Sequence, residues 1–93
     1  MKRLKEFAKA YKLNPIVPMT ELEGKEIVIQ GFRTGVTRFG DALFIDFTGE
    51  DGKSYTTVTS SELIRNACYE AKEAGAFPVA AKFVKKDNYW TIV

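Results

Sequence analysis

The chain has 93 residues, of which 45% are hydrophobic and 28% are charged, and its net charge is +2. These values predict one globular domain and exclude a strongly basic one, so a polyanion would be bound by local clusters of Lys and Arg. The absence of histidine, the single cysteine and the lack of a long apolar run argue against a zinc site, an internal disulfide and a membrane span. We therefore expect a cytoplasmic protein without a metal or cofactor.

Residues 1–23 are predicted to precede the main domain as an amphipathic helix and an extended connector. Within residues 2–13, apolar side chains recur at the spacing of one helical face, and most of the lysines fall on the other face. Pro15 ends this helix, because the residue before a proline is disfavoured in the helical region. Apolar residues after it form the connector.

The pattern of residues 25–59 predicts three consecutive antiparallel strands. The first, over residues 25–38, is long, and Gly31 and Gly35 would let it bend. A turn containing Asp-Gly joins the second strand to a third over residues 54–59. The second strand alternates strictly, with Leu43, Ile45 and Phe47 on one face and Phe44, Asp46 and Thr48 on the other.

Residues 59–75 have helical spacing, with one apolar stripe formed by Leu63, Ile64, Ala67, Cys68 and Ala71. Thr59 with Glu62 forms a capping-box pattern, although Ser60 or Ser61 could be the cap instead, and Gly75 follows the last turn. Residues 77–85 and 89–93 then alternate around a short polar turn, which predicts a final hairpin.

The order of elements, a helix followed by β-β-β-α-β-β, predicts a mainly β protein. It is the order of the OB-fold, a five-stranded Greek-key β-barrel, which would occupy residues 24–93 with an extra N-terminal helix before it. The helix between the third and fourth strands would plug one end of the barrel. The alternative is an α+β sandwich with one helix on an open sheet.

The sequence does not favour an enzyme. It lacks histidine, the commonest general base, and Cys68 lies on the apolar stripe of the predicted helix. Its acidic residues follow no spacing typical of a metal or two-carboxylate site, and it has no glycine-rich phosphate loop.

Single-stranded nucleic acid is bound by aromatic side chains that stack on bases, next to Lys and Arg that contact phosphates. In an OB-fold, the face of the second and third strands and two loops carry out this binding. If Val58 points inward, Tyr55 and Thr57 lie on the outward face of the third strand, and Tyr55 is the strongest stacking candidate. Phe44 could instead lie under the N-terminal helix, and Trp90 is more typical of a core. The predicted nucleic-acid-binding residues are Arg33, Arg38, Phe39, Phe44, Lys53, Tyr55, Thr57, Lys85, Lys86 and Tyr89.

Residues 24–93 resemble small OB-fold single-stranded DNA-binding proteins of phages and mobile elements. The resemblance rests on the Gly-Phe pair at residues 31–32, on a DGK-Y-T hairpin that leads to T-S-S-x-x-L, and on the aromatic-Pro-Val sequence at residues 77–79. It implies a sequence-tolerant binder of single-stranded DNA in replication, recombination or repair. By position it implies roles for Arg33, Phe44, Tyr55 and the loops at 38–39 and 85–89. Bacterial relatives of this class recruit partners through an acidic C-terminal tail, which is not expected here.

Single-stranded DNA is therefore the expected partner, and single-stranded RNA is an alternative. A second alternative is an OB-like domain that binds another protein through its exposed strand and N-terminal helix. An exposed edge along the long first strand would also let two copies pair as a homo-oligomer.

Overall fold

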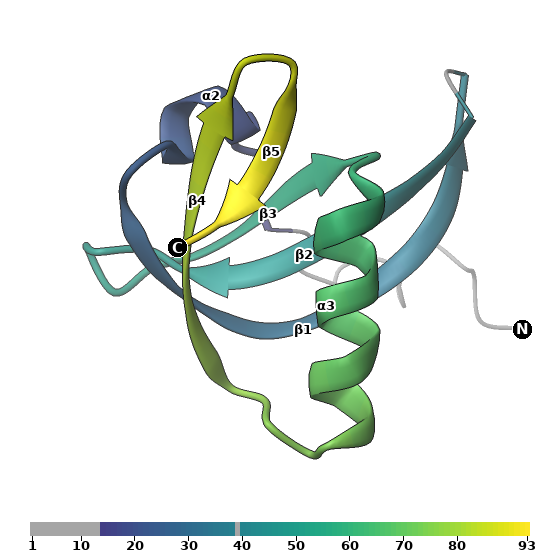
Figure 1. Ribbon diagram of the computed structural model, residues 1–93. Coiled ribbons are helices and arrows are strands. Elements are labelled where there is room, and N and C mark those ends of the chain that lie inside the picture. The colour runs from purple at the N-terminus through teal and green to yellow at the C-terminus, as the bar shows by residue number, and fades with distance from the viewer. Residues whose placement is uncertain (1–13, 39) are drawn as a thin grey trace, which may run out of the picture.

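The computed structural model describes residues 14–38 and 40–93. Five strands and two helices occupy them (Figure 1). In chain order these are α2 (Met19–Leu22), β1 (Glu26–Thr37), β2 (Gly40–Thr48), β3 (Ser54–Thr59), α3 (Glu62–Glu73), β4 (Val79–Lys86) and β5 (Tyr89–Ile92). The predicted β-β-β-α-β-β order is confirmed. The single turn of α2 lies where an extended connector was predicted, and the helix predicted over residues 2–13 lies outside the described residues.

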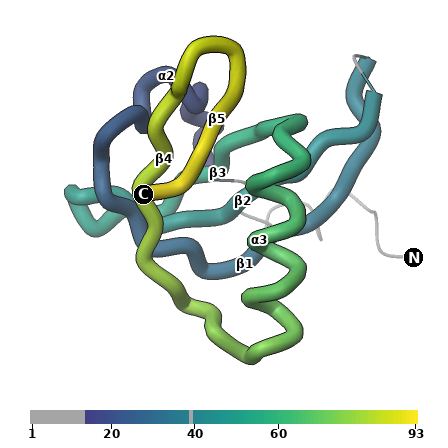
Figure 2. The backbone as a smooth tube through the Cα atoms, in the orientation of Figure 1, coloured from purple at the N-terminus to yellow at the C-terminus, as the bar shows by residue number. Residues whose placement is uncertain are grey.

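The five strands form one antiparallel sheet in the order β3-β2-β1-β4-β5. β1 pairs with β4 near its start, along Glu26–Ile29, and with β2 from Val28 to its end. The register with β2 shifts between Ile29 and Gly31, so one extra residue bends the strand where a glycine was predicted to allow it. Figure 2 shows β1 curving from β4 toward the far end of the β1–β2 hairpin.

The sheet is not closed, so the predicted barrel is not confirmed. β3 and β5 are the two edges of the strand order, and no ladder joins them among the described residues. At the edge of β3, the amide of Thr56 donates to the carbonyl of Pro15, and the amide of Val17 donates to the carbonyl of Thr56. The connector thus occupies hydrogen-bonding groups that β5 would need in order to complete a barrel.

The core lies between the inner face of the sheet and α3, which crosses in front of β1 and β2 (Figure 1). The alternation of β2 is as predicted, because Leu43, Ile45 and Phe47 are buried. The main partners of this β2 row are Ile27, Ile29, Ile64, Cys68 and Phe83.

The ends of α3 follow from local chemistry. Ser61, rather than Thr59, is the N-cap, and its Oγ accepts a hydrogen bond from the amide of Ile64. Thr59 Oγ1 instead accepts a bond from the amide of Ser61. Gly75 follows the helix with a φ of +64°, which a glycine adopts without strain.

The helices in the described part of the chain are all too short or too polar to cross a lipid bilayer. Residues 14–38 and 40–93 also contain no group of three or more His, Cys, Asp or Glu side chains that could hold a metal ion.

Candidate functional site

The register of β2 and β3 places two of the predicted binding residues, Tyr55 and Thr57, on the inner face of the sheet. Phe47 pairs with Tyr55 and Ile45 pairs with Thr57, and paired residues of an antiparallel ladder point to the same side. Thr57 is 0% exposed, and its Oγ1 has no hydrogen-bond partner among the described residues. The prediction that Tyr55 and Thr57 face outward is therefore wrong.

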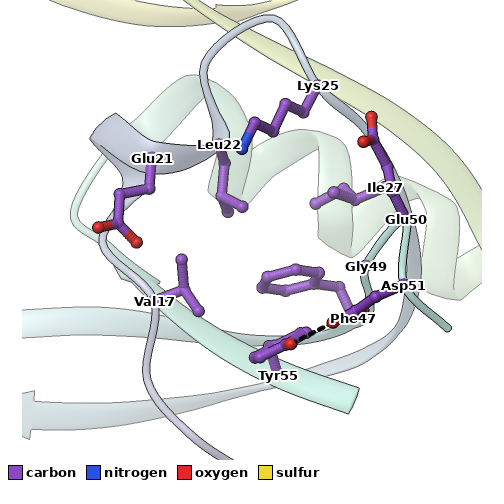
Figure 3. A pocket seen from close by; sticks show the side chains of 10 residues that line it. All are labelled: Val17, Glu21, Leu22, Lys25, Ile27, Phe47, Gly49, Glu50, Asp51 and Tyr55. Atoms are coloured by element: carbon purple, nitrogen blue, oxygen red, sulfur yellow. Dashed lines mark hydrogen bonds between the residues drawn. The ribbon is translucent and has the colours of Figure 1, made fainter. Parts of the chain in front are cut away.

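Tyr55 borders a hollow of about 350 Å³ between the connector, α2 and the β2–β3 turn (Figure 3). Its ring stacks on Phe47 with a centroid distance of 5.8 Å, and its hydroxyl donates to Asp51 Oδ2. The charged residues around this hollow are Glu21, Lys25, Glu50 and Asp51. With three carboxylates against one ammonium, the hollow does not suit a phosphate. Lys53, another predicted binding residue, lies beside it and donates its backbone amide to Asp51 Oδ1.

The Tyr55–Asp51 hydrogen bond shifts the pKa values of both side chains, each in a direction that can be measured. It holds the pKa of the Asp51 carboxyl below its ordinary value of 3.8, with help from the Lys53 amide. It also raises the pKa of Tyr55 above its ordinary value of 10.0. Because the pKa of Asp51 is lowered, its ionised carboxylate stabilises the fold above pH 3.8, and this stabilisation is lost as the pH falls through the lowered pKa. Because the pKa of Tyr55 is raised, its protonated phenol stabilises the fold below pH 10.0, and this stabilisation is lost as the pH rises through the raised pKa.

We expect Tyr55→Phe to move the pKa of Asp51 upward, toward its ordinary value, because the largest cause of the lowering is removed. An NMR titration that follows the Asp51 carboxyl carbon measures this shift. Tyr69→Phe is the matched control and should leave the Asp51 pKa where it is, since Tyr69 contacts Phe32 instead. An unchanged Asp51 pKa in Tyr55→Phe would contradict the bond.

The outer face of β1, β2 and β3 carries an arginine beside an aromatic ring. Arg33 and Phe44 are register partners, and the guanidinium carbon lies 5.7 Å from the ring centroid, within the range of a cation–π contact. The ring occupies space left by Gly35, where an added Cβ would come within 2.7 Å of a ring carbon. Phe44 is half-buried in this position, so part of its ring remains accessible.

A groove of about 560 Å³ lies where the sheet fails to close, between β3 with the start of α3 and the β4–β5 hairpin. We call it the seam groove. Leu63 and Tyr89 are exposed and Trp90 is half-buried. Its lining includes Val58, Leu63, Asn88, Tyr89 and Trp90.

Two lysines and one glutamate lie at or near the seam groove. In the β4–β5 ladder, Lys85 pairs with Trp90 and Lys86 pairs with Tyr89, so two ammonium groups accompany the two aromatic rings. Glu62 also lines the groove. This arrangement can accept a polyanion, but its affinity would depend on stacking as well as on charge.

The outer face and the seam groove are continuous through Val58. Val58 is the register partner of Phe44 and also lines the groove. Aromatic or apolar side chains therefore follow one another from β1 to the hairpin, with Arg33 at one end and Lys85 and Lys86 beside the other. We call this series the stacking path, and its members are Arg33, Phe44, Val58, Tyr89 and Trp90.

Half of the predicted residues, namely Arg33, Phe44, Lys85, Lys86 and Tyr89, lie on or beside the stacking path. Arg38 lies in the turn after β1, and Phe39 falls outside the described residues. Val58, Leu63 and Trp90 were not predicted to bind. Leu63 was assigned to the buried stripe of the helix, and its place directly after the cap residues was the signal that it could be exposed.

Residues 15–92 match the model of a protein family described as a domain of unknown function, DUF8468. No curated protein and no solved structure matches the chain. The family match covers every helix and strand of the described structure.

Proposed function

The chain belongs to the DUF8468 family, and we propose that it binds single-stranded nucleic acid, in the first place DNA, along the stacking path. The observation that carries this proposal is the continuity of the path. Arg33 and Phe44 on the outer face lead through Val58 to Tyr89 and Trp90 in the seam groove. Binding without catalysis, in replication, recombination or repair, is the role that we propose for it.

The path suits unpaired bases better than a duplex. An aromatic ring can stack on a base only when that base is unstacked from its neighbours, and every base offers such a face. None of the five members of the path carries a side-chain amide that would read the edge of one particular base, and among the described residues that line the seam groove only Asn88 does. We therefore propose binding with little sequence specificity.

The strand order supports an OB-fold that is open between β3 and β5. The five antiparallel strands, the β1 strand shared by β2 and β4, and a helix between β3 and β4 are the parts of a partly open Greek-key barrel. In that fold, oligonucleotides bind on the second and third strands and on the loops beside them. The stacking path crosses β2 and β3 and ends at the β4–β5 hairpin.

The test is a fluorescence titration of the protein with oligo-dT. Trp90 is the only tryptophan of the chain and lines the seam groove, so its emission reports directly on the proposed site. We expect quenching at low salt that weakens as salt rises, because phosphate contacts release counterions. A parallel titration with oligo-U compares RNA with DNA.

An absence of quenching at low salt, with no binding by a second method such as gel shift, would reject nucleic-acid binding. The exposed Leu63 and Tyr89 at the same groove would then favour the alternative of a surface that binds another protein.

A further inference from the structure

Asp46 lies on the outer face of β2, which is the middle strand of β1, β2 and β3. Its register partners are Gly31 on β1 and Thr56 on β3. Arg33 donates from one guanidinium nitrogen to Asp46 Oδ2 at 2.9 Å, and Thr56 donates from its hydroxyl to Asp46 Oδ1. The same guanidinium lies beside the ring of Phe44. The Asp46 carboxylate thus determines where the guanidinium of Arg33 is held.

This carboxylate conflicts with the binding of a polyanion. A phosphate that approaches Phe44 meets a negative charge, and it meets an arginine whose charge is already compensated. The Arg33 and Asp46 side chains are 55% and 27% exposed, so water screens the pair. Exposed pairs of this kind change an equilibrium constant by a factor of at most about five. A phosphate can therefore displace Asp46 from Arg33.

We propose that Asp46 is a positioning residue that holds Arg33 beside Phe44 in the free protein and competes with the nucleic-acid phosphate for it. This inference rests on the proposed function. When phosphate takes the guanidinium, Asp46 keeps the hydrogen bond from Thr56 and remains partly hydrated. The exchange leaves no buried charge without a partner. Its consequence is weaker binding, and a smaller salt dependence, than the arginine alone would give.

The test is Asp46→Asn, measured by oligo-dT titration over a range of salt concentrations. Asparagine keeps an acceptor oxygen for Thr56 and removes the charge. We expect binding about two- to fivefold tighter, the range of an exposed ion pair. The slope of log K against log salt should steepen by about 0.7, the value for one more phosphate contact on a single strand.

Two controls separate this effect from the loss of any negative charge. Glu50→Gln removes an exposed carboxylate in the β2–β3 turn, away from the stacking path, and should change neither affinity nor slope. Arg33→Gln introduced into the Asp46→Asn protein should abolish the gain, because the freed cation is then absent. If Asp46→Asn does not fold by circular dichroism, Asp46→Ser carries the same expectation.

Unchanged or weaker binding by the Asp46 variant, with clear binding by the wild type, overturns this inference and leaves the proposed function standing. A gain equal to that of Glu50→Gln also overturns it. If the wild-type protein fails to bind oligo-dT at low salt, the proposed function is rejected and the inference is rejected with it.

Discussion

Phe83→Ala should lower the free energy of unfolding by about 3–5 kcal/mol, the usual range for deleting a buried aromatic ring. Phe83 is 1% exposed and packs in the same cluster as the inward residues of β1 and β2 and Ile64 of α3. It belongs to β4, which joins the rest of the sheet only at the start of β1. Its ring therefore holds the two parts of the sheet together, and urea unfolding followed by circular dichroism measures the loss.

The control for Phe83→Ala is Val36→Ala, at a β1 position that is 81% exposed. We expect its effect to stay within about 0.5 kcal/mol, as for surface substitutions in general. A loss of less than about 1 kcal/mol for Phe83→Ala would contradict the packing of β4 against the core, since it lies far below the cavity range.

Tyr89→Ala should weaken the binding of oligo-dT by about 1–3 kcal/mol, which is about 5- to 150-fold, if one base stacks on its ring. Tyr89 is the most exposed aromatic residue on the stacking path and lines the seam groove opposite Leu63. The truncation removes stacking area without leaving a cavity, because the side chain is 55% exposed. Fluorescence of Trp90, the adjacent residue, gives the affinity of both proteins.

Tyr69→Ala is the matched control for Tyr89→Ala. Tyr69 is 41% exposed, lies on α3, and contacts Phe32 away from the seam groove. Its replacement should change the affinity less than twofold. Equal losses in the two variants would mean that exposed tyrosines act through the stability of the fold, and a neutral Tyr89→Ala would remove the hairpin from the path.

Local patterns were sufficient to predict the five strands and α3. The alternation of β2 is strict, the Asp-Gly pair supplies a positive φ at Gly52, and Gly75 terminates α3, so each boundary has a cause within a few residues. The α2 turn was missed because four residues are too few to establish a helical period.

The faces of β3 could not be assigned in this way. Its residues are Ser, Tyr, Thr and Val, so neither set of alternate positions is clearly apolar. In the structure Val58 points outward and Thr57 points inward, with no hydrogen-bond partner for its hydroxyl in residues 14–38 and 40–93, which is the reverse of the usual preference. Tyr55, the predicted stacking residue, therefore lies on the inner face together with Thr57. Val58 lies on the outer face and belongs to the stacking path.

The gap between the edge strands β3 and β5 could not be predicted from local sequence patterns either. Whether two edge strands meet depends on contacts between residues more than 30 positions apart and on what else competes for the edge. Here the connector donates to, and accepts from, the backbone of Thr56. A pattern of apolar residues carries no information about such a backbone pairing, so the groove and its residues Leu63 and Trp90 emerged only from the structure.

The attachment of the β4–β5 hairpin has a further consequence for motion. The ladder between β1 and β4 ends at Lys82. Beyond it, the Phe83 carbonyl accepts from the Gly24 amide and the Lys85 amide donates to Glu23 Oε2, and the ladder partners of β4 belong to β5. Segments with few hydrogen bonds to the rest of a protein open at a lower free energy than the whole fold. We therefore expect the tip of the hairpin beyond Lys85, whose ladder bonds run only between β4 and β5, to open at a lower free energy than the β1–β2–β3 layer. In the proposed binding of nucleic acid, such opening would change the width of the seam groove, which would admit purines as well as pyrimidines.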